Sequence, residues 1–231
     1  MAINVNNSFI GTPPLDGGVY FRAPLGTPLP KTVLEELNKA FEDHGAVGED
    51  GFSVTPTRNN TDIRMMGGDV FRTVQSEYGV EAVLTLLEDD TEAVVKTTFG
   101  DSKTTKKNLE KGGVERTVYY SSDPLPISSH VLKAVDGDKT NLYLIERGQV
   151  VSVGERRVAH SDVTRTELTI RAYKSTTPEF EGANVVERRY DPNAKANDDK
   201  AGDESERGDA EESEGTTNEA GGTTNDSGAT S

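Results

Sequence analysis

The chain has 231 residues, contains no cysteine and no tryptophan, and carries a formal net charge of −15. Without cysteine it can form no disulfide framework, no thiolate metal site and no cysteine nucleophile. Its first 14 residues lack the basic start and the apolar run of a signal peptide, and no window approaches the roughly 20 consecutive apolar residues of a membrane span. We therefore expect a soluble protein that is made in a cytoplasm and does not enter a membrane.

The negative charge is concentrated at the C-terminal end. Residues 191–231 hold 12 acidic and 3 basic side chains and no Val, Ile, Leu, Met or Phe, so nothing offsets the entropy of ordering them. We expect a disordered acidic tail there, after a single domain over residues 15–190. Because Lys and Arg are rarely clustered, the chain is a poor candidate for binding the phosphate backbone of nucleic acids.

Residues 1–14 are polar and include Pro13 and Pro14, which block regular structure. They predict a flexible N-terminal arm that is either disordered or ordered against a neighbouring subunit. In the second case Phe9 and Ile10 are candidate contacts between subunits.

Residues 33–43 follow a Thr32-x-x-Glu35 capping box and carry apolar residues at helical spacing, which predicts a short helix. Short strands are expected before and after it, with the turn residues Asn59 and Asn60 separating the last two. These strands cover residues 17–22, 51–57 and 62–66.

The stretch of residues 61–100 has the most informative pattern in the chain. Alternation from residue 70 predicts one half-buried strand, residues 80–87 predict a second, and a tight link at Tyr78-Gly79 joins them. The acidic and capping residues at 89–92 then favour a helix N-terminus, and Gly100 suits its C-cap. We expect the Val94, Val95 and Phe99 side of this helix to pack on the sheet.

Residues 101–113 predict a long linker with the one basic cluster in the chain. Its lysines are candidate contacts between subunits: Lys103, Lys106, Lys107 and Lys111. Strands resume at residues 114–121 and 129–135, and a turn follows at residues 136–138. A hairpin across Arg147-Gly148, a strand over residues 165–173 and a last strand over residues 184–189 complete a mainly β, antiparallel sandwich or barrel with one or two short helices.

The pattern contains no constellation that supports catalysis. The three histidines His44, His130 and His160 have no metal-ligand spacing, no glycine-rich loop has the context of a phosphate site, and no serine has a base and an orienting acid. Asp89-Asp90 is more simply read as charge at a helix N-terminus than as an acid pair. We expect no enzyme activity, no metal and no cofactor.

The run GGDVFRTVQSEYGVEAVLTLLEDDTEAVVKTTFG resembles the central motif of major tail proteins of long, flexible-tailed bacteriophages, especially those of actinobacteria. Supporting pieces occur in order around it, from GGVYFRAPLGTPLPKT to the late segments GQV and LTI. The resemblance covers roughly residues 17–189. The lysine-rich linker and the acidic tail depart from it.

The resemblance implies a structural virion protein, assembled in the host cytoplasm. Such a protein would form a two-sheet β-sandwich flanked by a helix. Six subunits would join their sheets into a ring, and rings would stack into a tail tube around a tape-measure protein. Tail terminator and tail-tip proteins would be further partners, and DNA would pass through the lumen without specific binding. In this reading the candidate lumen or subunit-contact residues are Arg72, Gln75, Glu77 and Glu81.

Two alternatives stay open. A tail terminator or connector would form a single ring and stop. A β-sandwich module that binds carbohydrate or a host surface would expose aromatic side chains in a groove, yet aromatic residues are only 6% of the chain and Trp is absent. Alternation would also place Tyr119 and Tyr120, the adjacent aromatic pair, on opposite faces.

Overall fold

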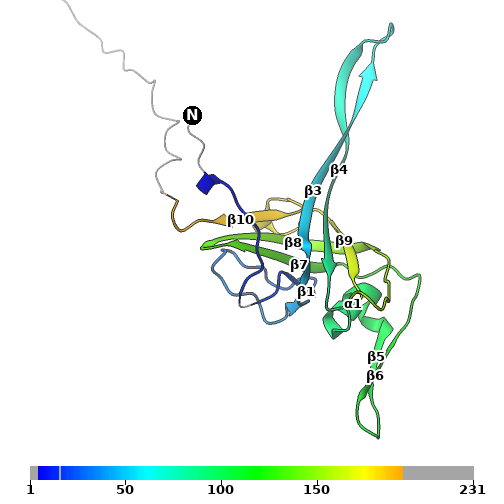
Figure 1. The fold of residues 1–231 in the computed structure, drawn as a ribbon. Helices are drawn as coiled ribbons and strands as arrows, with labels where there is room; N and C mark the ends of the chain where they lie inside the picture. The colour runs from blue at the N-terminus through cyan, green and yellow to red at the C-terminus, as the bar shows by residue number, and fades with distance from the viewer. Residues whose placement is uncertain (1–4, 16, 195–231) are drawn as a thin grey trace, which may run out of the picture. The chain divides into compact units, whose positions relative to one another are not determined.

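The computed structural model describes residues 5–15 and 17–194 (Figure 1). The chain divides after Asn193, and every element below belongs to the part before that division. Residues 1–4 of the predicted arm and residues 195–231 of the predicted acidic tail lie outside the described residues.

Eight strands form one antiparallel sheet in the order β2-β1-β7-β8-β9-β4-β3, with β10 also paired to β8. A separate two-stranded sheet joins β5 to β6. The predicted mainly β, antiparallel fold is therefore confirmed.

The strands of the large sheet are β1 (Tyr20–Pro24), β2 (Glu42–Asp43), β3 (Val47–Arg64), β4 (Val70–Leu86), β7 (Ser128–Asp136), β8 (Lys139–Val153), β9 (Thr166–Ala172) and β10 (Val186–Tyr190). The small sheet holds β5 (Thr104–Asn108) and β6 (Val114–Val118), and the helices are α1 (Glu92–Phe99) with the 3-10 turns η1 (Val5–Asn7), η2 (Asp101–Lys103) and η3 (Pro178–Phe180).

The large sheet curls around its main core. Tyr20 from β1, near one edge of the sheet, packs in the same buried cluster as Leu84 from β4, near the other edge. Neighbouring residues on β7 and β8 point to opposite faces, as strand geometry requires. Leu132 therefore enters this first cluster, whereas Val131 enters a second cluster on the other face.

The predicted helix over residues 33–43 is wrong. The segment runs through turns into the short strand β2. The Asn38 side chain accepts a hydrogen bond from the Ala40 amide at 3.0 Å, a local alternative to helical pairing. The apolar side chains Val33, Leu37 and Phe41 still pack, against the second cluster. The spacing of apolar residues in segment 33–43 thus correctly indicated side chains that pack on the core, but these side chains pack without forming a helix.

The predicted helix after the central strands is confirmed as α1. The Thr91 side chain accepts a hydrogen bond from the Val94 amide, and Gly100 ends the helix with a φ of 98° that a side chain would disfavour. Val94 and Val95 are buried, and Val94 belongs to the main core.

Three predicted breaks in strands are also wrong. Asn59-Asn60, Tyr78-Gly79 and Arg147-Gly148 each lie inside one continuous strand, β3, β4 and β8 respectively. The asparagine pair marks a register shift rather than a turn. At Gly148 a Cβ atom would lie only 2.4 Å from the His130 ring. Glycine is required there by close packing, which sequence patterns do not distinguish from a turn.

The predicted linker of residues 101–113 is ordered as η2, β5 and the turn into β6. Gly112 and Gly113 both have positive φ, at 84° and 93°, and close the turn of this hairpin. Thr104 and Thr105 are β-branched and favour an extended backbone. The segment is rich in lysine and poor in apolar residues, so its composition predicted a linker although its threonines favour a strand.

Two buried histidines flank Tyr20. The Tyr20 hydroxyl lies 2.8 Å from His130 Nδ1, and its ring lies against that of His44, with 4.6 Å between the ring centroids. His130 Nε2 lies 3.0 Å from Ser128 Oγ, and His44 Nε2 lies 2.7 Å from Thr97 Oγ1. Burial, reinforced by the nearby Arg22 charge, lowers the pKa of His130 to about 3 and that of His44 to about 4. Both rings are therefore neutral in the folded chain near neutral pH.

This burial predicts a pH-dependent stability. An unfolded histidine takes up a proton near pH 6.5, whereas the folded rings resist protonation until about pH 4 and 3. The unfolded state thus binds more protons in this window. The free energy of unfolding should fall, as pH drops below 6.5, by at most about 1.4 kcal/mol per pH unit for each ring.

Urea unfolding between pH 7.5 and 5, above the range in which most carboxylates titrate, measures this slope. A free energy of unfolding that is flat from pH 6.5 to 5 would show that both rings take up protons in the folded chain as they do in the unfolded one, and about half the slope would show this for one ring.

Candidate assembly interface

Among the described residues, no further strand or helix packs against the outer half of the β3–β4 hairpin. Strand β9 pairs with β4 only from Val80 to Leu86. Beyond that point β3 and β4 pair only with each other, to the turn after Arg64, and extend past the rest of the sheet (Figure 1). We call residues 57–78 the outer hairpin. A two-stranded ribbon of this kind is marginally stable by itself in water.

The outer hairpin exposes large apolar side chains. Met66 and Phe71 near its turn are 106% and 70% exposed relative to reference values. Four other large apolar side chains on it are exposed as well: Ile63, Met65, Val70 and Tyr78. A soluble monomer rarely collects apolar surface on one protruding element, so this concentration indicates a binding surface.

Polar pairs hold the two strands of the outer hairpin in register. Asn59 donates to the Glu77 carboxylate at 2.8 Å, and Thr73 donates to the Asp62 carboxylate at 2.8 Å. The Arg58 guanidinium lies 4.8 Å from the centroid of the Tyr78 ring. These contacts are exposed, so each contributes little to stability.

The candidate lumen or subunit-contact residues fall along β4. Arg72, Gln75 and Glu77 lie on the outer hairpin, and among the described residues Arg72 has no ion pair. Glu81 lies at the base of the hairpin, where it accepts from Arg171 of β9 at 2.7 Å. The structure therefore places three of the four on the protruding element and uses the fourth within the sheet.

Two of the four candidate lysines pair within their own chain. Lys103 lies 2.6 Å from the Asp123 carboxylate, and Lys106 lies 3.6 Å from that of Glu92 on α1. Lys107 stands opposite Glu115 in the register of β5 and β6, and Lys111 lies in the turn between them. Lys107 and Lys111 are thus the exposed members of the set that remain available to a neighbour.

The N-terminal arm is attached to β7 in the part of it that the structure describes. Thr12 and Val135 exchange two backbone hydrogen bonds of 2.8 and 2.9 Å. The Ile10 amide donates to Asp136, while the Ile10 side chain stays 69% exposed. Phe9 is half-buried beside a cleft of about 530 Å³ that Phe52 and Tyr143 also line.

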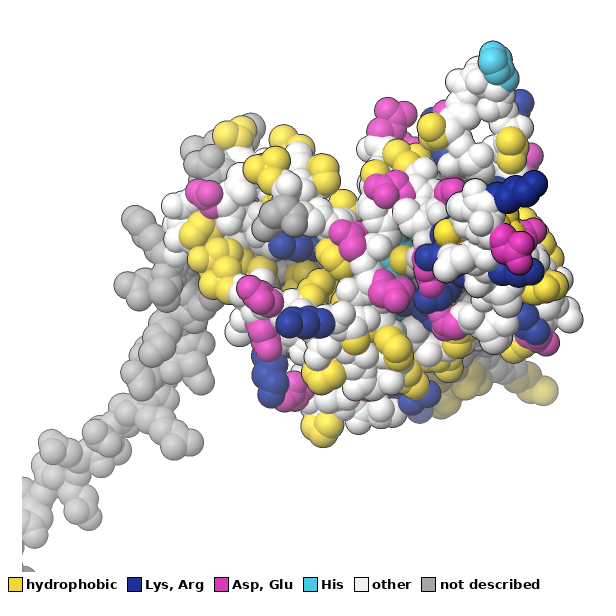
Figure 2. All heavy atoms as spheres, turned by 90° about the horizontal axis from the view of Figure 1, so that it is seen from below, with side chains coloured by type: hydrophobic (Ala, Val, Ile, Leu, Met, Phe, Trp, Pro, Cys, Tyr) yellow, Lys and Arg dark blue, Asp and Glu magenta, His cyan; other side chains and the backbone are white. Residues whose placement is uncertain are grey.

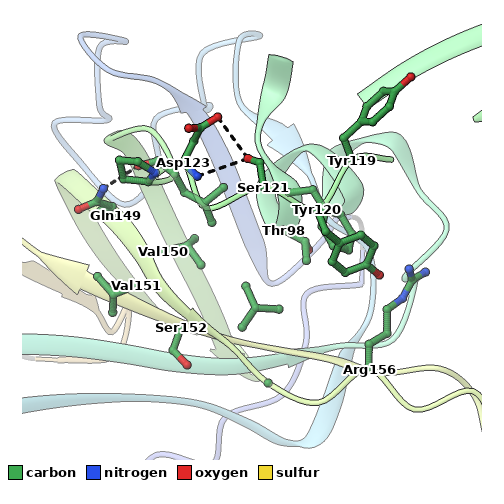
Figure 3. Close-up of a pocket in the computed structure, with 15 residues that line it drawn as sticks. Thr98, Tyr119, Tyr120, Ser121, Asp123, Gln149, Val150, Val151, Ser152 and Arg156 are labelled. Carbon is green, nitrogen blue, oxygen red and sulfur yellow. Dashed lines mark hydrogen bonds between the residues drawn. The ribbon is translucent and has the colours of Figure 1, made fainter. Parts of the chain in front are cut away.

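Figure 3 shows a larger cleft, of about 740 Å³, which the sequence patterns missed. Phe99 and Tyr120 form part of its wall, with 4.6 Å between the centroids of their rings, and Tyr119 points away from Tyr120. Its other side is β8: the lining includes every residue from Gln149 to Gly154. In the sequence, the adjacent aromatic residues Tyr119 and Tyr120 were the feature that pointed to this part of the chain.

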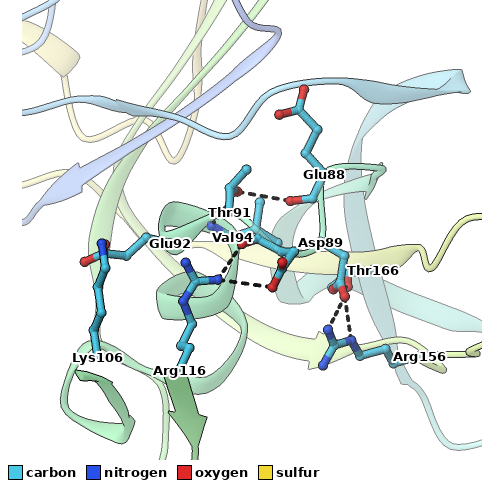
Figure 4. A network of polar contacts seen from close by, with 10 residues as sticks. Glu88, Asp89, Thr91, Glu92, Val94, Lys106, Arg116, Arg156 and Thr166 are labelled. Atoms are coloured by element: carbon cyan, nitrogen blue, oxygen red, sulfur yellow. Dashed lines mark hydrogen bonds and ion pairs between the residues drawn. The ribbon is translucent and has the colours of Figure 1, made fainter. Parts of the chain in front are cut away.

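A polar network fixes the start of α1 and the loop after β8 (Figure 4). The buried Asp89 carboxylate accepts from Thr166 at 2.5 Å and from Arg156 Nε at 2.7 Å, with a second contact to the Arg156 guanidinium. Arg116 of β6 bonds to Asp90, which attaches the small sheet to the same site. The adjacent carboxylates thus serve two separate structural contacts.

The described residues contain no group of three or more His, Asp or Glu side chains that could hold a metal ion. Acidic and basic side chains are interspersed on the face seen in Figure 2, with hydrophobic patches between them. No described helix is long and apolar enough to cross a membrane.

Neither known family models nor curated proteins match this sequence. Among solved structures, the chain is similar to one in the virion of a native gene transfer agent particle, with 8% identity and a TM-score of 0.35, over 60% of this chain and 88% of that one. It is also similar to a chain of a PVC sheath–tube complex in the extended state, part of an extracellular contractile injection system, with 8% identity and a TM-score of 0.38, over 78% and 93% of the two chains. The cap that terminates the tube of the anti-feeding prophage gives 9% identity and a TM-score of 0.36, over 82% of this chain and 100% of that one.

The Asp89 network predicts a large loss of stability on truncation. In Asp89→Ala, Arg156 loses its carboxylate and the buried Thr166 hydroxyl loses its acceptor, so the free energy of unfolding should fall by roughly 3 kcal/mol. Asp162→Ala is the matched control, since it removes an exposed partner of Arg165 and should cost less than about 1 kcal/mol. Urea melts of both variants test this, and equal losses would contradict a special role for Asp89.

Proposed function

We propose that this chain is a structural virion protein that polymerises as stacked, hexameric rings into the tail tube of a long, flexible-tailed phage. The observation that carries the proposal is the outer hairpin. It is a protruding ribbon with exposed apolar side chains from Ile63 to Tyr78, and in the described part of the chain no third strand supports it.

The physical argument starts from the stability of that ribbon. Fixing the backbone of each residue costs about 1–2 kcal/mol in conformational entropy, and exposed cross-strand pairs return only a fraction of that. Burying the apolar side chains of the hairpin on another subunit contributes roughly 25 cal/mol per Å² of apolar surface. A ribbon with this composition is therefore best explained as one half of a contact between subunits.

Two further features support the same proposal. The β4 side of the outer hairpin and α1 lie within the run that resembles major tail proteins, which begins at Gly67. Residues 1–190 are also net acidic, at −6, since the other nine of the 15 net negative charges lie in residues 191–231, and a negative lumen would repel DNA and let it slide. In this function the partners are further copies of the chain, a tape-measure protein in the lumen, and terminator and tail-tip proteins. DNA is present only in transit.

Assembly should depend on the apolar end of the hairpin. The double variant Met66→Asp, Phe71→Asp should fold like the wild type, because both side chains are exposed, but should lower the yield of assembled particles by about tenfold or more. Leu34→Asp changes a side chain outside the hairpin whose exposure, 72%, is close to the 70% of Phe71, and this variant should assemble normally.

Circular dichroism, size-exclusion chromatography and negative-stain microscopy of the three proteins give the answer. Long tubes from the wild type support the proposal, whereas single closed rings would favour a terminator and persistent monomers a binding module. If the double variant forms tubes in normal yield, the outer hairpin is not the contact between subunits.

The β5–β6 hairpin gives a second, electrostatic test. If Lys107 and Lys111 meet an acidic neighbour, the double variant Lys107→Ser, Lys111→Ser should weaken assembly at low salt and match the wild type near 1 M salt. Lys103→Ser, Lys106→Ser removes ion pairs within the chain, so it should change stability more than assembly. Unchanged tube yield at every salt concentration in the first variant would reject the contact.

A further inference from the structure

The larger cleft runs along the edge of a strand. Consecutive side chains of a strand point to opposite faces of the sheet, so no cleft over one face can be lined by six residues in a row. The cleft is lined by all of Gln149 to Gly154, with segment 119–125 on its opposite side. It is therefore a slot in which the backbone edge of β8 forms one wall.

That edge is unpaired in the part of the chain that the structure describes. Strand β7 occupies it only as far as Gly148, which pairs with Ser128, and β9 uses the other edge of residues 148–153. A β-bulge at Val151 bends the strand at this point. Unpaired backbone N–H and C=O groups in a partly apolar slot form a template for an added strand.

The slot also exposes apolar side chains. Val151 and Val153 are 42% and 37% exposed, and Tyr120 is 76% exposed. The slot and the outer hairpin both carry large exposed apolar side chains, and the two surfaces differ in form. The hairpin protrudes, and the slot is recessed.

The geometry points to the outer hairpin of a second copy as the occupant of this slot. Its strand β4, near Val70 to Val74, adds to the free edge of β8 at Gln149–Val153, and the side chain of Phe71 packs against the apolar lining. This inference rests on the proposed function, and it names the two surfaces that meet.

Charge agrees with this pairing. Among the described residues, Arg72 beside Phe71 has no carboxylate partner, and Glu155, which follows the slot residue Gly154 in the sequence, has no cationic partner. Arg156, which also lines the slot, is already paired with Asp89. Other segments of the chain fit less well, since residues 191–231 lack large aliphatic side chains and carry nine net negative charges. The outer hairpin, in contrast, is already extended and has a free edge on β4 from Val70 to Gly79.

The contact is heterologous, because the hairpin and the slot are different surfaces of one chain. Each copy can offer its hairpin to one neighbour and receive the hairpin of another. Such contacts do not stop at a dimer but continue into closed rings or open filaments.

Disulfide trapping tests this directly, because the chain has no cysteine of its own. Phe71→Cys in a full-length protein with a size tag is mixed with untagged Val151→Cys, Ser152→Cys or Val153→Cys, and each mixture is oxidised. A disulfide requires Cα atoms within about 7 Å, and three neighbouring positions cover different registers. Leu34→Cys, at an exposed position outside the slot, is the control.

At least one slot variant should give about tenfold more mixed-size dimer than the control, and addition of unlabelled wild-type protein should reduce it. Microscopy of the same mixtures shows whether particles assemble. If they assemble but none of the three slot positions gives more mixed-size dimer than the control, the inference is wrong while the proposed function stands. Protein that stays monomeric at every concentration would overturn both.

Discussion

The antiparallel pairing of β3 with β4 connects the hydrophobic core to the protruding part of the domain. In its inner half, β4 supplies Val80, Ala82, Leu84 and Leu86 to the main core and pairs with β9 on its other edge. In its outer half the same two strands continue without support from the sheet. One continuous pair of strands therefore joins the hydrophobic core to the most exposed surface of the domain.

The contacts around α1 make the region next to that core rigid. Asp89 and Thr91 fix the start of the helix, and Gly100 fixes its end. Arg22 of β1 forms a two-point ion pair with Asp101, with distances of 3.0 and 2.9 Å, just after the helix. Such bidentate geometry holds both partners in one orientation. The wall of the slot that contains Phe99 is thus held by three contacts: those of Asp89 with Thr166 of β9 and with Arg156 after β8, and that of Asp101 with Arg22 of β1.

Local signals in the sequence predicted the parts of the fold that depend on local physics. Alternation located β9 and the inner half of β4, and cap residues located α1 at both ends. Long-range packing decided the remainder. Gly148 looks like a turn residue, but only its contact with His130, 18 residues away, explains why glycine is needed. The apolar residues of segment 33–43 look helical because packing against the second cluster produces a similar spacing. The slot could not be predicted at all, since it depends on where β7 stops pairing with β8.

Amide hydrogen exchange of the hairpin, compared between monomeric and assembled protein, shows whether the outer hairpin is the contact between subunits. In the monomer, amides of the inner half of β4 should be protected by the core, whereas amides of residues 57–78 should exchange quickly through fraying of an unsupported ribbon. On assembly the outer hairpin should gain protection by at least about tenfold. Outer-hairpin amides that exchange at the same rate in both states would contradict its role as the contact between subunits.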